Sequence, residues 1–265
     1  MISERYSQHG FFGVCAVLFA ASAAMMIVWC ASMSAKGEMP MPGGWTMSMA
    51  WMRMPDETWF RAGASFLGMW VVMMAAMMLP SLFPLLNRYR QAVRATEERR
   101  IDRQTALAAA GYFFIWTMVG LCAFAVGSAL TTIEMRQPAV ARVVPVLVGF
   151  VVLISGALQF TAWKAYHLSC CREGPGRGRM LPADTVSAWQ YGLRLGLHCS
   201  CCSAGLTAIL LVVGVMDSRM MAMITAAVTT ERLAPSGEHV ARVIGILVST
   251  AGLFLVIQAL LGTYK

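Results

Sequence analysis

The sequence predicts an all-α protein, a polytopic transmembrane helix bundle of six or seven spans. Hydrophobic residues make up 58% of the 265 residues and charged residues only 13%, whereas about a quarter of the residues in a soluble domain are charged. The mean hydropathy is +0.63. Apolar runs near the roughly 20 residues that cross a hydrocarbon core recur along the whole chain. We therefore expect residues 1–265 to form a single integral membrane domain surrounded by the lipid bilayer.

Six apolar runs predict spans, in chain order, at residues 11–33, 59–86, 105–130, 143–166, 193–216 and 240–261. The apolar part of the first run is too long for a signal peptide, so it predicts a retained helix. A seventh span at residues 220–230 (MMAMITAAVTT) is uncertain, because this segment is apolar but short.

The distribution of basic residues favours seven spans. With residues 220–230 counted as a span, the loops on the N-terminal side hold 14 of the 21 Lys and Arg residues. Such an excess marks cytoplasmic loops, so we expect a cytoplasmic N-terminus in a bacterial inner membrane. The side of the C-terminus stays open. The net charge of +8 does not indicate nucleic-acid binding, because the basic residues fall in short connections and no basic helix is interleaved with aromatics.

Methionine is concentrated in the predicted outer loop between the first two spans. The sequence MPMPGGWTMSMAWMRMP contains three Met-x-Met pairs: Met39 and Met41, Met47 and Met49, and Met52 and Met54. In an extended segment such pairs place two thioethers on one side, where they can share a soft ion. Thioethers form no disulfides, so they can capture Cu(I) in an oxidising compartment. Alternatively, methionine serves as an adaptable apolar residue at the membrane surface.

The second predicted span carries a methionine ladder. Met69, Met73 and Met77 recur every four residues, as do Met74 and Met78, so these side chains stack on adjoining helix faces. Met73 and Met77 could pass a soft cation along the helix. The competing interpretation is ordinary packing or a lipid-facing surface.

Five of the eight cysteines lie in two clusters, each preceded by a histidine. The first comprises His167, Cys170 and Cys171, and the second comprises His198, Cys199, Cys201 and Cys202. Spacings of three and four residues put these ligands on shared helix faces. We expect them at the inner ends of the fourth and fifth spans, where a helix N-terminus and Arg194 would favour the thiolate form. Copper fits these ligands, and zinc at structural sites uses the same residue types. Cys15, Cys30 and Cys122 are isolated and fit packing positions.

Three carboxylates, Glu134, Asp217 and Glu231, lie at predicted span ends. Ionisable residues near a membrane are functional candidates. Glu231 beside Arg232 could equally be an interfacial ion pair.

Three stretches together resemble the bacterial family of predicted metal-binding integral membrane proteins, a family of unknown function. They are MWVVMMAAMMLPS (69–81), CREGP (171–175) and the segment 192–235, within a resemblance that covers roughly residues 60 to 250. The family's Cys-x-x-Cys-Cys motif falls on Cys199, Cys202 and Ser203, so serine replaces its last cysteine and Cys201 is additional. His167 stands where the family tends to have cysteine. The resemblance implies a metal site at His167, Cys171, Cys199 and Cys202 and leaves the metal's identity open.

The leading hypothesis is a membrane protein, not an enzyme, that passes Cu(I) from the outer methionines to the inner His/Cys site. Thiolates bind Cu(I) more tightly than thioethers, so ligand strength rises inward. A metallochaperone or a metalloenzyme complex would be its partner, and oligomers are compatible with the sequence. The first alternative is a membrane thiol–disulfide redox protein. The second is an accessory subunit of a membrane complex with a structural metal site.

Overall fold

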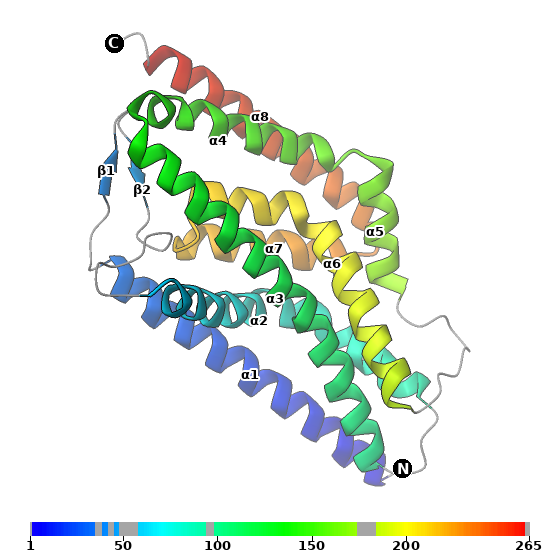
Figure 1. Ribbon diagram of the computed structural model, residues 1–265. Helices are drawn as coiled ribbons and strands as arrows, with labels where there is room; N and C mark the ends of the chain where they lie inside the picture. The colour runs from blue at the N-terminus through cyan, green and yellow to red at the C-terminus, as the bar shows by residue number, and fades with distance from the viewer. Residues whose placement is uncertain are drawn as a thin grey trace.

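The described part of the computed structural model, residues 2–34, 39–41, 45–47, 58–93, 98–173 and 184–262, contains eight helices and one β-hairpin (Figure 1). The helices are α1 (Ile2–Ser34), α2 (Trp59–Ala92), α3 (Glu98–Arg136), α4 (Pro138–Leu158), α5 (Ala162–Glu173), α6 (Thr185–Val213), α7 (Ser218–Leu233) and α8 (Gly237–Gly262). The antiparallel hairpin joins β1 (Met39–Met41) to β2 (Trp45–Met47). The predicted helix bundle is confirmed.

Within the described residues, six helices are long and apolar enough to cross a membrane: α1, α2, α3, α4, α6 and α8. The uncertain seventh segment forms α7, which at 16 residues is shorter than these spans. It nevertheless runs back along α6, so the chain changes direction at each of α6, α7 and α8 (Figure 1). The C-terminal end of α8 lies near the hairpin, at the opposite end of the bundle from the start of α1 (Figure 1).

The fourth and fifth predicted spans have different bounds in the structure. The helix predicted to run through residue 166 ends at Leu158. Three backbone hydrogen bonds, each from an N–H to the carbonyl three residues earlier, turn the chain over residues 159–161. The Thr161 hydroxyl then accepts a hydrogen bond from the Lys164 N–H and so caps α5. The fifth predicted span corresponds to α6, which begins at Thr185 instead of residue 193. The Asp184 carboxylate caps this helix by accepting a hydrogen bond from the Ser187 N–H at 2.9 Å.

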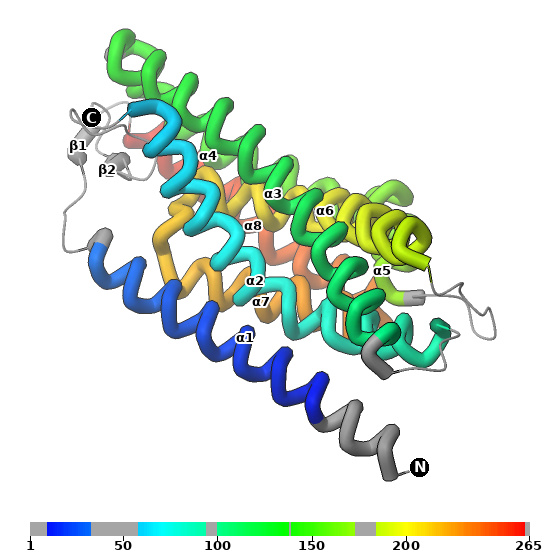
Figure 2. Tube along the Cα trace, turned by 60° about the horizontal axis from the view of Figure 1, so that its bottom comes forward, coloured from blue at the N-terminus to red at the C-terminus, as the bar shows by residue number. Residues whose placement is uncertain are grey.

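Helix α6 is the centre of the bundle and packs against α3, α4, α5 and α7, while α1 lies along one edge beside α2 (Figure 2). Small residues let α3 and α6 approach closely: a Cβ on Gly111 would lie 2.8 Å from the Trp189 carbonyl, and one on Gly192 would collide with Ala108. Such contacts are typical of helix pairs in membranes, where close packing replaces the hydrophobic driving force. They fix the position of the cysteine-bearing part of α6 against α3.

The methionine ladder of α2 faces the protein interior. Met73, Met74 and Met78 have no exposed surface, and Met69 and Met77 are also buried. The ladder is thus not a lipid-facing surface. Two prolines, Pro80 and Pro84, lie inside the second half of this helix. The Ser81 hydroxyl, one turn beyond Met77, donates to the Met78 carbonyl at 3.0 Å.

Candidate metal centre

Three cysteines from two helices are enclosed in the bundle: Cys171 on α5 and Cys199 and Cys202 on α6, which are 1–2% exposed. Cys171 and Cys202 lie close enough to share a hydrogen bond, and this contact, together with burial, raises the pKa of the Cys171 thiol. On the other side of the cluster, the Cys199 sulfur lies 2.8 Å from the Tyr112 hydroxyl of α3. The three buried thiols, called the thiol cluster below, thus consist of the pair Cys171 and Cys202 and a third thiol, Cys199, that contacts α3.

Cys199 and Cys202 do not lie in the first turns of their helix, as the sequence predicts. Cys199 is 14 residues after Thr185, or about 21 Å along the axis, beyond the reach of the helix N-terminus. Arg194 is exposed. The expectation that a helix terminus and Arg194 would favour thiolate is wrong, because α6 begins eight residues earlier than predicted.

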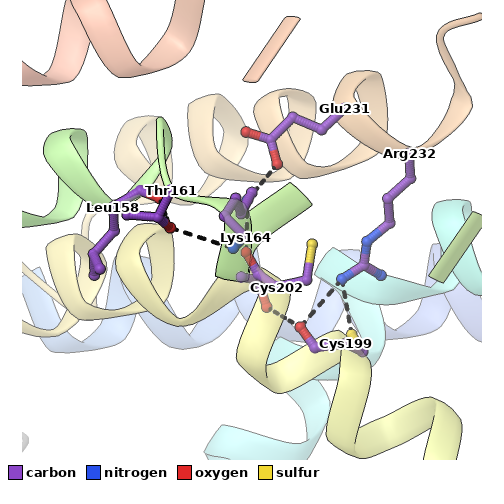
Figure 3. Close-up of polar contacts among 8 residues, drawn as sticks. Leu158, Thr161, Lys164, Cys199, Cys202, Glu231 and Arg232 are labelled. Carbon is purple, nitrogen blue, oxygen red and sulfur yellow. Dashed lines mark hydrogen bonds and ion pairs between the residues drawn. The ribbon is translucent and has the colours of Figure 1, made fainter. Parts of the chain in front are cut away.

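Two other cations, Lys164 and Arg232, lie beside Cys202 and Cys199 (Figure 3). Lys164 of α5 donates to the Cys202 carbonyl at 2.6 Å and to the Glu231 carboxylate of α7 at 2.7 Å. Arg232 of α7 donates to the Cys199 sulfur at 2.9 Å and to the Ser81 hydroxyl of α2 at 3.0 Å. All of these side chains are buried. Lys164 and Arg232 are hence not loop charges, and Glu231 pairs with Lys164 instead of its neighbour Arg232.

Removing Lys164 and Arg232 from the loop count leaves 12 of 19 basic residues on the N-terminal side, so the charge bias persists. Asp217 has a local role: its carboxylate caps α7 by accepting from the backbone N–H groups of Arg219 and Met220. Glu134 is half-buried on α3.

The two histidines meet each other. His167 of α5 and His198 of α6 approach with their Nδ1 atoms 3.0 Å apart, and both rings are half-buried. Burial and the neighbouring His198 ring lower the pKa of His167, which favours the neutral imidazole. Neutral imidazole is the form that binds metal ions.

Cys170 and Cys201 are half-buried on the same two helices. Within the described residues, no group of three or more His, Cys, Asp or Glu side chains is arranged as a metal site. The predicted ligands are therefore brought together as pairs and not as one closed coordination shell. Of the cysteines assigned to packing, Cys30 is buried, Cys15 is half-buried and Cys122 is exposed.

The methionine-rich loop is described only in part. Its backbone is extended at residues 39–41 and 45–47, as expected, and Met39 pairs with Met47 across the hairpin. The remaining predicted ligands there, Met49, Met52 and Met54, lie outside the described residues.

Comparison with known protein families identifies the family to which this chain belongs. Residues 67–255 match the copper chaperone family PpoB2. The chain belongs to the PpoB2 copper chaperone family. The match covers more than half of the chain and supports copper binding or handling, in agreement with copper as the predicted ion. No curated protein and no solved structure matches the chain.

The region shared with the PpoB2 family includes the buried methionines of α2, the five clustered cysteines, both histidines of the pair, Lys164, Glu231 and Arg232. It excludes residues 39–54 of the methionine-rich loop. Nothing in the sequence indicates that Tyr112 contacts Cys199 or that Ser81 contacts Arg232, because a single hydroxyl on an apolar helix gives no signal of what it contacts.

Proposed function

We propose that this protein carries Cu(I) through the membrane region along a series of sulfur ligands, from the outer methionine-rich loop to the buried thiols of Cys171, Cys199 and Cys202. Membership of a copper chaperone family supports copper as the ion. The order of the ligands supports the route. Thioethers precede thiolates along it, so the ion would move toward ligands that hold Cu(I) more tightly.

One observation supports the proposal: the buried methionine face of α2 is connected to Cys199 through Ser81 and Arg232. Met74, Met77 and Met78 lie within two turns of Ser81 on this helix. Arg232 links Ser81 to the Cys199 sulfur. Packing alone would be served equally well by leucine, whereas a soft ion moving through an apolar interior needs sulfur.

The buried charges suit a bound Cu(I) ion. Two thiolates with one Cu(I) ion form a complex with one negative charge, which an apolar interior disfavours unless it is compensated. Lys164 and Arg232 outnumber Glu231 by one positive charge in the same cluster. The protein thus supplies a compensating positive charge beside the thiols, so no counterion from solvent is needed.

We further propose that the hairpin end of the bundle faces the outside of a bacterial inner membrane and that the start of α1 faces the cytoplasm. The positive-inside bias supports this orientation. The ion would then be captured by methionines in an oxidising compartment and received by thiols nearer a reducing one, where they remain reduced. A protein partner would supply or remove the ion.

Proteoliposome uptake of Cu(I) tests the route. The variant Met73→Leu/Met77→Leu removes two buried sulfurs with little change in volume, so we expect it to fold and to retain copper at the cysteines. We expect its uptake rate to fall by at least about tenfold, because two ligands of the path are missing. Met118→Leu/Met223→Leu is the matched control, since both of these methionines are exposed. Equal uptake by all three proteins would refute the α2 route.

A further inference from the structure

The contact between α5 and α6 holds two pairs of ligand side chains, one helical turn apart. His167 meets His198, and Cys171 meets Cys202. Each cysteine follows its histidine by four residues, so on both helices the two side chains share one face at successive turns. In the sequence, the four-residue spacing of histidine and cysteine suggests one mixed His/Cys site. In the structure, the same residues form two adjacent pairs, one of histidines and one of cysteines.

The two pairs differ in access. The thiols are enclosed, whereas both imidazoles are half-buried. The rings of Trp163 and Tyr166 contact His167 edge-on, and these aromatic side chains are 44% and 61% exposed. The imidazole pair thus borders the surface of the bundle, and the thiol pair lies behind it.

We propose that His167 and His198 form a second copper site, separate from the thiols, at which the ion is exchanged between the buried cysteines and a partner at the protein surface. This inference rests on the proposed function of the thiol cluster. Imidazole is a common copper ligand but a harder one than thiolate. Copper would therefore stay at the imidazoles only briefly and remain longer at the cysteines.

The geometry needs little change to admit an ion. Metal–imidazole bonds near 2.0 Å place two nitrogens about 4 Å apart on either side of an ion, so the present separation of 3.0 Å must widen by about 1 Å. One Nδ1 carries the proton of the present hydrogen bond. That proton moves to Nε2 of the same ring, which frees both Nδ1 lone pairs without changing the charge of either histidine.

Anaerobic titration of the full-length protein with Cu(I), followed by X-ray absorption, tests the separation of the sites. In the wild type we expect the first ion to show sulfur ligands only and a second ion to add imidazole scattering. The variant His167→Asn/His198→Asn keeps polar side chains at the contact and should bind the first ion unchanged and lose the second. Its transfer of copper to a soluble Cu(I) chelator should slow by at least about tenfold. His239→Asn, at an exposed position on α8, is the control.

Two results would overturn the inference while leaving the proposed function standing. One is imidazole and sulfur scattering together from the first ion, which would mean a single mixed site. The other is loss of the first ion in the histidine variant. A wild-type protein that binds no copper would instead refute the proposed function, and this inference with it.

Discussion

The guanidinium Nη2 of Arg232 lies 2.9 Å from the sulfur of Cys199, with both side chains enclosed in the bundle. The same guanidinium reaches Ser81, so this one side chain joins α7 to α6 and α2. A cation against a buried sulfur lowers the cost of keeping that sulfur negative. The readiness of Cys199 to bind an ion is therefore linked to the position of α7.

We expect Arg232→Gln to destabilise the protein and to weaken copper binding together. Removing one partner of a buried charged contact typically costs about 3–5 kcal/mol of unfolding free energy. Unfolding of the detergent-solubilised protein and competition with a Cu(I) chelator measure the two effects. Arg219→Gln, exposed on the same helix, should change neither. Wild-type behaviour of the Arg232 variant would show that this contact is dispensable.

The ion pair between Lys164 and Glu231 predicts strongly non-additive substitutions. Lys164→Met alone leaves a buried carboxylate without its partner and should lower the unfolding free energy by about 3–5 kcal/mol. Lys164→Met/Glu231→Gln removes both charges and should recover most of that loss. A double-mutant cycle on unfolding measures the coupling. Additive effects of the two substitutions would contradict the pairing.

Close packing of α3 and α6 should be intolerant of even one added methyl group. A Cβ on Gly192 would collide with the backbone of Ala108, so Gly192→Ala should destabilise the protein by about 1–3 kcal/mol. Because Tyr112 and Cys199 face each other across the same contact, copper affinity should fall as well. The comparison is Gly13→Ala in α1, where an added Cβ meets nothing within 4 Å and unfolding should be unaffected.

The reversal of the chain at α7 predicts that the two ends of the bundle carry opposite termini. A reporter fused after residue 262 should locate to the side of the methionine-rich loop, and one fused before α1 to the other side. Enzymatic and fluorescent reporters that work on only one side of the membrane distinguish these cases. Both reporters on one side would mean that α7 does not carry the chain back through the bundle.

Hydropathy was sufficient to find the six helices that are long and apolar enough to cross a membrane, because lipid demands long apolar segments. It misplaced the helix ends where local hydrogen bonds, and not hydropathy, decide where a helix begins or stops. The helix break at residues 159–161 has no proline or glycine to mark it, and the first two turns of α6 are too polar to register as part of a span. The second of these errors placed Cys199 and Cys202 at the start of a helix, whereas they lie near its middle.

Spacing correctly indicated which ligands share a helix face, since i and i+4 neighbours are set by helical geometry alone. The partners across helices could not be read from it. Lys164 and Arg232 look like ordinary loop charges in the sequence, and only the packing of α5 and α7 on α6 brings them to the thiols. For the same reason the pairing of Glu231 with Lys164, 67 residues away, has no local signal.

The copper content of the purified protein tests the central claim most directly. Wild-type protein and Cys171→Ser/Cys202→Ser would be loaded with Cu(I) anaerobically, separated from free ions and assayed for copper and for free thiols. The account predicts tightly bound copper with sulfur ligands in the wild type and its loss in the double variant. Wild-type protein that retains no copper, and in which Cys171 and Cys202 instead form a reversible disulfide, would contradict it and favour a thiol–disulfide function.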